Sequence, residues 1–144
     1  VITASTSTSS SISSDIPFDN STPQNTEGVE VLTASITPTN ASSTLIIQAW
    51  AGLVDCAAKT AMTLFKDSGA NALAVSTQQA GSTTEDSTIV SLIHVVSAGS
   101  TSSQTFKVRM GSNSGATLYV NRNSWGDIMN GTAAVRLLVW EITP

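Results

Sequence analysis

Charged residues are scarce in this chain. Asp, Glu, Lys and Arg make up 11% of its 144 residues, which is under half of the roughly 25% usual for soluble domains. Only six residues are Lys or Arg, and the formal net charge at pH 7 is −4. A nucleic-acid-binding protein normally presents a basic face to the phosphates. We therefore expect no nucleic-acid partner.

Cysteine and histidine are nearly absent. The single cysteine, Cys56, excludes a disulfide framework within one chain. The single histidine, His94, excludes a metal site built from two histidines of one chain. Three copies of His94 around a trimer axis could still bind an ion, but a histidine packed beside Val90 and Leu92, or at a subunit contact, is the simpler interpretation. We expect no required metal and no other cofactor.

Long apolar runs are also missing. No run approaches the roughly 18 residues that a membrane-spanning helix needs, and no charged start precedes a signal-like segment. We therefore expect no membrane insertion. The first residue is Val rather than Met, which indicates a processed or partial product.

Serine and threonine replace charges, and the chain divides into three parts. These two residue types make up roughly 30% of the sequence; threonine favours strands and serine favours turns. Residues 1–14 are almost all hydroxyl-bearing and predict a tether or a loosely held arm. In residues 15–28, Pro17 and Pro23 fix φ and remove backbone donors, which predicts an extended strap outside the sheet. Residues 29–144 are long enough to form one domain.

Eight short runs of apolar and β-branched residues follow the strap, and turn residues separate them. The runs are residues 29–38, 43–54, 59–67, 72–79, 87–96, 104–110, 116–122 and 133–142. This pattern predicts an all-β, antiparallel sandwich or barrel. Only residues 57–65, which are rich in Ala and also contain Met and Leu, could form a helix instead.

Alternation along one run separates a core face from a solvent face. Phe106, Val108 and Met110 share one side of the predicted strand at residues 105–110, and the residues between them are polar. Side chains point to opposite faces at successive positions of a strand. This run is therefore expected to have one face in the core and one in water.

Two other runs, at residues 88–96 and 133–142, are apolar on both faces. An antiparallel strand of this kind needs a cover on its second face. In a short chain without helices, another copy of the chain is the expected cover, and each large apolar side chain buried there contributes roughly 1.5–3 kcal/mol. The candidate contact residues are Leu92, His94, Leu138, Trp140 and Ile142.

Patterns that indicate catalysis are not found. No nucleophile-elbow motif accompanies His94 and the many serines. Cys56 has no Lys, Arg or His within two residues that could lower its pKa, so a small buried residue is expected rather than a reactive thiol. Glu85 and Asp86 could pair with another carboxylate as in glycosidases, but acids beside a turn are usually solvated. We expect no enzymatic activity.

The loop at residues 121–131, "NRNSWGDIMNG", is the best candidate for a binding surface. It places Trp125 among Arg122, Asn123 and Asp127. An aromatic ring can stack on the apolar face of a sugar or protein, while amide and charged neighbours make directional bonds. The alternative is that Trp125 folds back and caps the core.

Four stretches together resemble the C-terminal modules of bacteriophage tail fibres and related virion proteins. They are residues 16–28, 32–47, 97–122 and 137–142. The resemblance implies a compact jelly roll that trimerises, similar in architecture to tumour necrosis factor and complement head domains. It fades at residues 54–62 and 123–132, where a receptor-contacting surface could differ between relatives.

The resemblance also implies a homotrimer on the virion surface with one of two functions. The first is a host receptor-binding head of a phage tail fibre, whose partner is a glycan or protein of the host cell surface. The second is a structural capsid or tail decoration protein, anchored to other virion proteins by its N-terminal arm.

Overall fold

The computed structural model describes residues 1–79 and 87–144. In this part of the chain it contains ten strands and one 3₁₀ helix, and no helix there is long and apolar enough to cross a membrane. The elements are β1 (Ile2–Thr6), β2 (Ser10–Ile12), β3 (Val29–Ile36), β4 (Thr44–Asp55), β5 (Lys59–Lys66), β6 (Ala74–Gln79), β7 (Thr88–Ser97), β8 (Gln104–Ser112), β9 (Leu118–Val120), η1 (Met129–Gly131) and β10 (Val135–Ile142).

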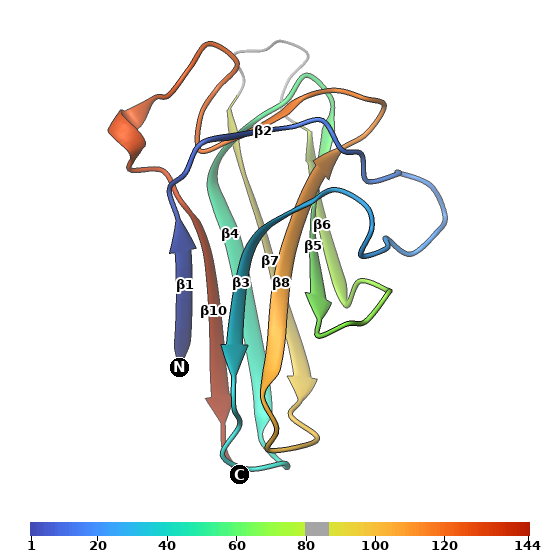
Figure 1. Ribbon diagram of the computed structural model, residues 1–144, viewed down its shortest axis with the longest axis vertical. Helices are drawn as coiled ribbons and strands as arrows, with labels where there is room; N and C mark the ends of the chain where they lie inside the picture. The colour runs from blue at the N-terminus through green and yellow to red at the C-terminus, as the bar shows by residue number, and fades with distance from the viewer. Residues whose placement is uncertain (80–86) are drawn as a thin grey trace.

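The strands form two antiparallel sheets that pack face to face (Figure 1). Sheet A has the order β1-β10-β4-β7; β9 pairs with the last residues of β4, and β2 pairs with β9. Sheet B has the order β3-β8-β5-β6. The chain passes repeatedly from one sheet to the other, which is the jelly-roll arrangement. The all-β jelly-roll prediction is confirmed.

Each of the eight predicted runs contains a strand, and the helical alternative at residues 57–65 does not occur. Residues 59–66 form β5, which lies between β8 and β6. The hydroxyl of Thr60 donates to the carbonyl of Gln78, and that of Thr63 donates to the carbonyl of Arg109, both at 3.1 Å. Threonine favours a strand, and pairing on both sides outweighs the helix propensity of Ala and Met.

Residues 1–14 differ from the expected tether, and this is a correction. β1 pairs with β10 along its whole length, and β2 pairs with β9. Ile2 and Ala4 lie opposite buried residues of β10, and Ile12 is itself buried. Alternating apolar residues therefore join this segment to sheet A. The many serines and threonines around these apolar residues make their alternation difficult to recognise in the sequence.

The hydrophobic core lies between the two sheets. Phe106, Val108 and Met110 of β8 are completely buried in it, and the polar residues that alternate with them are half-buried on the other face. The predicted core face of this strand is confirmed, but its other face is not open to water throughout, because Arg109 on that face is bound by the strap. On β10 the core-facing residues include Leu137 and Val139, also completely buried.

The strap, residues 15–28, lies across the outer face of sheet B. Its first residue, Asp15, accepts hydrogen bonds from the backbone N–H of Gly115 at 3.0 and 2.9 Å. Near its end, Arg109 of β8 donates from Nε to the carbonyl of Glu27 and from Nη2 to that of Gly28, both at 2.8 Å. The strap is therefore fastened at its start to the loop after β8 and at its end to β8 itself.

The strap also buries part of the outer face of sheet B. Ile16 of the strap is buried, and so are Ala61 and Phe65, which point outward from β5 and do not belong to the core between the sheets. The outer face of sheet B thus has a cover supplied by its own chain.

Candidate functional site

The outer face of sheet A carries a group of large apolar side chains in adjacent rows. The strand register places Trp140 of β10 opposite Ile46 of β4, and Ile46 opposite Val95 of β7. Ile93 and Val95 are 64% and 58% exposed. We call this surface the apolar face, and its members are Ile46, Trp50, Ile93, Val95, Leu138, Trp140 and Ile142.

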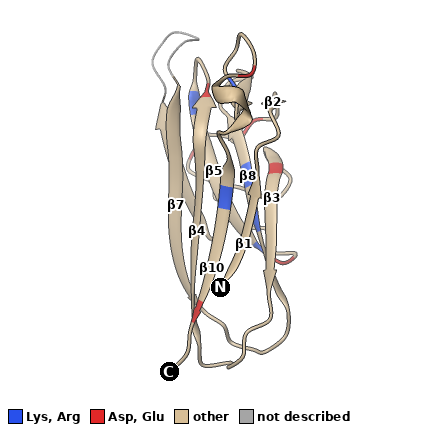
Figure 2. Ribbon diagram, turned by 90° about the vertical axis from the view of Figure 1, so that its left-hand side faces the viewer, with Lys and Arg blue, Asp and Glu red and all other residues tan. Residues whose placement is uncertain are grey.

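Charged side chains are sparse around the apolar face. β1 and β7 contain no Asp, Glu, Lys or Arg, and β10 contains only Arg136 and Glu141 (Figure 2). The Arg136 guanidinium lies over the ring of Trp50, 6.0 Å from its centroid. Both residues line a cavity of about 340 Å³ together with Leu138. Large contiguous apolar patches on a soluble protein mark interaction sites, so this surface is a candidate for contact with another protein.

The structure separates the predicted subunit-contact residues into two groups. Leu138, Trp140 and Ile142 belong to the apolar face, as expected. Leu92 and His94 do not, and this is a correction: Leu92 is buried in the core of its own chain, and His94 is half-buried on the same inward side of β7. The outward positions of β7 alternate with them, so Ile93 and Val95 take their place.

The candidate binding loop, residues 121–131, is fixed at its base by a buried asparagine. Asn121 is 1% exposed and has a φ of 58°. Its Nδ2 donates to the carbonyls of Thr6 at 3.0 Å and Thr8 at 3.1 Å. Asn121 therefore ties the start of the loop to the connection between β1 and β2.

Two further side chains hold the tip of the loop. The Asn123 Oδ1 accepts hydrogen bonds from the backbone N–H groups of Trp125 and Gly126, both at 3.1 Å. Asp55, at the end of β4, is 1% exposed, and its Oδ2 accepts from the backbone N–H of Ser124 at 2.8 Å. The backbone around Trp125 is thus held by the Asn123 turn and by the rigid end of a core strand.

Trp125 points into solvent from this fixed backbone. Its side chain is 72% exposed, and Met129 further along the loop is 69% exposed. The alternative in which Trp125 folds back onto the core does not occur. In Figure 1, η1 of this loop lies at the upper end of the sandwich and the C-terminus at the lower end.

The other three predicted binding residues differ in how free their polar groups are. The Arg122 Nε donates to the carbonyl of Asn123 at 3.2 Å, and its guanidinium lies 5.5 Å from the ring centroid of Tyr119. The Asn123 carboxamide oxygen is engaged in the turn. Asp127 is exposed. Trp125 and Asp127 are therefore the most available for a partner, while Arg122 and Asn123 also shape the loop.

Groups that could support catalysis or metal binding are not brought together. In residues 1–79 and 87–144, no three His, Cys, Asp or Glu side chains gather where they could hold a metal ion. Cys56 is buried, and its burial raises the pKa of the thiol, which lowers the reactivity of a cysteine. Glu85 and Asp86, considered above as part of a carboxylate pair, lie outside the described residues.

The fold places the chain among compact jelly-roll domains, and comparison of sequences narrows this to one family. The sequence model of the family described as the Pgp3 C-terminal domain matches residues 8–144. The chain belongs to this family. No curated protein matches the sequence. The family supports the jelly-roll head implied by the tail-fibre resemblance, but it does not support a phage origin.

Two solved structures show distant similarity. The first, the structure of Eiger TNF from S. frugiperda, is 12% identical with a TM-score of 0.49, over 99% of this chain and 94% of that one. The second, the enzymatically active domain of bacteriophage CBA120 tailspike protein 4, is 16% identical with a TM-score of 0.34, over 98% of this chain but only 19% of that one. At such low TM-scores neither similarity bears on function.

Proposed function

We propose that this domain is a trimeric, non-enzymatic head that binds a partner through the loop at residues 121–131. The observation that carries the proposal is the exposure of Trp125, 72% of whose side chain is in solvent although the loop backbone beneath it is fixed. An ordered, exposed tryptophan offers stacking area with little loss of freedom on binding. Binding residues also concentrate on loops held by a rigid scaffold.

The apolar face supports assembly into a trimer. The strap covers part of the outer face of sheet B, whereas the outer face of sheet A leaves Ile93 and Val95 more than half exposed. Each large apolar side chain transferred out of water contributes roughly 1.5–3 kcal/mol, so the seven residues of the apolar face could hold copies of the chain together. Trp125 lies outside this face and would remain accessible.

The more specific function that we propose for this domain is that of a host-attachment head of a phage tail fibre on the virion surface. It rests on the resemblance in residues 16–28, 32–47, 97–122 and 137–142, while the matched family is that of the Pgp3 C-terminal domain. The partner would be a glycan or protein of the host cell surface. A decoration protein anchored by a free N-terminal arm is the alternative, and the pairing of β1 and β2 within sheet A weighs against a free arm.

The test is replacement of Trp125 by Ala. We expect the variant to keep its assembly state and its thermal midpoint but to lose binding to host cells. Truncation of an interface tryptophan often costs about 2 kcal/mol or more, roughly thirtyfold in affinity per site. Three sites on one head would enlarge the loss on a cell surface. Binding of the fluorescently labelled domain to cells measures the effect.

Met129→Ala is the matched control, because it removes another exposed side chain from the same loop. We expect a smaller loss from this change than from Trp125→Ala. Unchanged cell binding by the Trp125 variant would show that the loop has only a structural role. If the parent domain binds no cell but binds purified virions, the decoration function would replace the receptor-binding one.

A further inference from the structure

A cavity lies on the opposite side of the molecule from the apolar face, between the strap and the outer face of sheet B. Its volume is about 320 Å³, which falls within the range of roughly 300–1,000 Å³ typical of small-ligand pockets. The buried residues Ile16 and Ala61 line it, and β6 supplies Val75 and Thr77. The cavity therefore combines an apolar lining with hydrogen-bonding groups at its rim.

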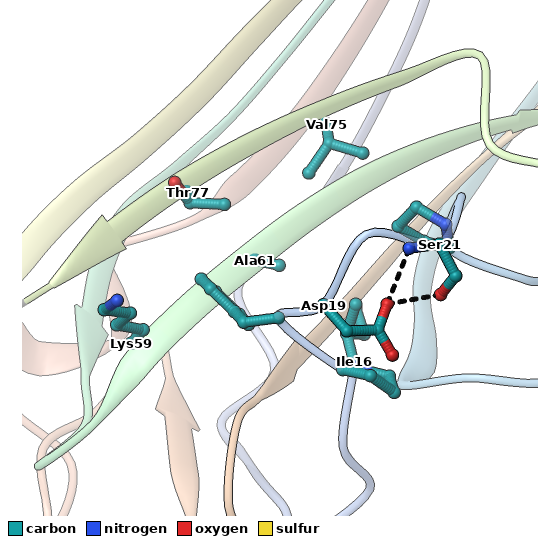
Figure 3. Close-up of a pocket in the computed structure, with 10 residues that line it drawn as sticks. Ile16, Asp19, Ser21, Lys59, Ala61, Val75 and Thr77 are labelled. Atoms are coloured by element: carbon teal, nitrogen blue, oxygen red, sulfur yellow. Dashed lines mark hydrogen bonds between the residues drawn. The ribbon is translucent and has the colours of Figure 1, made fainter.

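Opposite charges stand on two sides of this cavity. Figure 3 shows Lys59 on one side and Asp19 on the other. The Asp19 Oδ1 accepts from the hydroxyl of Ser21 at 2.5 Å and from its backbone N–H at 2.7 Å, and these hydrogen bonds hold the pKa of Asp19 below its ordinary value. A carboxylate in the cavity would be attracted to Lys59 and repelled by ionised Asp19, which fixes its orientation.

Phe18 and Lys59 join this cavity to a smaller one of about 210 Å³. The Lys59 ammonium lies 5.8 Å from the centroid of the Phe18 ring, and it is paired with no carboxylate in the part of the chain that the structure describes. The smaller cavity is also lined by Gln78 and by Gln79, and Gln79 lies opposite Lys59 in the strand register. We call the two cavities together the strap groove. It has one apolar compartment and one lined by amides.

We propose that the strap groove binds an acidic glycan. The carboxylate of a sugar acid would pair with the Lys59 ammonium, and charge-assisted hydrogen bonds of this kind are roughly twice as strong as neutral ones. An acetyl methyl group or the C–H face of a sugar ring would contact Val75 and the Phe18 ring. Sugar hydroxyls would bond to the carboxamide of Gln79, which lies opposite Lys59 and can both donate and accept.

The lining of the strap groove favours a glycan over an acidic peptide. A peptide that extends a sheet uses the free backbone edge of a strand, whereas the strap groove lies between the strap and the outer face of β5 and β6. An aromatic ring, amides, hydroxyls and one cation together suit a sugar acid.

The strap groove is independent of the loop at residues 121–131. It lies on sheet B, so a trimer held together through the outer face of sheet A leaves it open. Three grooves on one head would strengthen binding to a surface that displays many acidic sugars. The inference therefore does not rest on the role of Trp125.

Calorimetric titration of the whole chain tests this site with two tetrasaccharides. The first is from hyaluronan, which alternates glucuronic acid with N-acetylglucosamine, and the second is the neutral tetramer of N-acetylglucosamine. We expect the hyaluronan fragment to bind more tightly. Lys59→Gln should weaken that binding by about tenfold and leave the affinity for the neutral tetramer unchanged. Phe18→Ala should weaken both.

Lys66→Gln is the matched control, because it removes the same charge from the other end of β5, outside both cavities, and should leave both affinities unchanged. Absence of binding by the parent chain would overturn the proposal. Equal losses in the Lys59 and Lys66 variants would also overturn it, as would equally tight binding of a tetraglutamate peptide, which would show that charge alone is responsible. Loss of host-cell binding by Trp125→Ala with intact titration would separate the two sites.

Discussion

At the scale of single residues, Glu141 fixes the turn between β3 and β4 with one carboxylate oxygen. Its Oε1 accepts from the hydroxyls of Ser43 at 2.8 Å and Thr39 at 2.9 Å, and from the backbone N–H groups of Thr39 at 2.7 Å and Asn40 at 3.2 Å. The hydrogen bond from Ser43, followed by those from Thr39 and Asn40, holds the pKa of Glu141 below its ordinary value. The folded chain therefore favours the ionised carboxylate.

This preference makes a pH-dependent contribution to stability. Because the pKa is lowered on folding, the contribution is present above the unfolded-state pKa, about 4.3 for glutamate, and is lost as the pH falls through the lower folded value. We expect Glu141→Gln to lower the thermal midpoint at pH 7, and the difference from the parent chain to shrink below about pH 4.3. Thermal midpoints of both chains, measured at steps of about one pH unit from about pH 7 to about pH 3, test this.

Glu30→Gln is the control for that series. Glu30 is exposed on β3, and no hydrogen bond to its carboxylate occurs among the described residues. Its replacement should change the thermal midpoint little at any pH. A difference between Glu141→Gln and the parent chain that stayed constant throughout the pH series would contradict the role of the charged carboxylate.

At the scale of elements, close backbone contact holds the strap on sheet B. A Cβ at Gly111 of β8 would stand 2.7 Å from the carbonyl oxygen of Ser14 and 2.9 Å from Cγ1 of Ile16. Gly28 is equally confined, with the carbonyl oxygen of Met110 at 2.6 Å from its would-be Cβ. Glycine at these positions allows the strap to lie directly on the strand.

Gly111→Ala should therefore displace the strap or the strand. Overpacking of this kind costs about 1–3 kcal/mol, and we expect a loss of that size in the free energy of unfolding from chemical denaturation. Gly52→Ala on β4 is the matched control, since its Cβ would meet nothing closer than the carbonyl oxygen of Ala134 at 3.5 Å. Equal stability of the two variants would show that the strap is not packed tightly.

The positions of most strands could be predicted from the sequence, because turn residues close each run and apolar residues alternate within it. The sequence does not predict β1 and β2, because Ile2, Ala4 and Ile12 are isolated among serines and threonines. Their partners, β10 and β9, are more than a hundred residues away in the chain. Pairing between strands so far apart in the chain cannot be recognised from the residues next to each strand.

The candidate surfaces could be predicted only in part. The two apolar faces of the strand at residues 88–97 are visible in the sequence, but which of them meets the core depends on the packing of sheet A. The sequence therefore predicts Leu92 at the contact, whereas the structure has Ile93 there on the apolar face. The exposure of Trp125 likewise follows from the hydrogen bonds of Asn123 and Asp55 to the loop, and the latter joins residues far apart in the chain.

At the scale of the whole molecule, the two outer faces of the sandwich are unequal. The strap covers part of sheet B, and sheet A presents the apolar face. Leu138→Asp would place a charge in that face, where burial of an unpaired carboxylate against a second copy of the chain is strongly unfavourable. We expect this variant to be a folded monomer. Its mass in solution and its circular dichroism spectrum together measure the effect.

Ser35→Asp is the matched control for charge. Ser35 is exposed on β3 of sheet B, away from the apolar face, so the same added carboxylate should leave assembly intact. Dissociation of both variants to the same extent would indicate that added negative charge, rather than its position on sheet A, controls assembly.

The most direct measurement of the central proposal is the mass of the parent chain in solution by multi-angle light scattering at micromolar concentration. One chain has a mass of 14.8 kDa. We expect a single species of three chains, because the apolar face needs a cover that the described residues of its own chain do not supply. A stable species of 14.8 kDa at that concentration would contradict the trimer and would leave the apolar face exposed on a monomer.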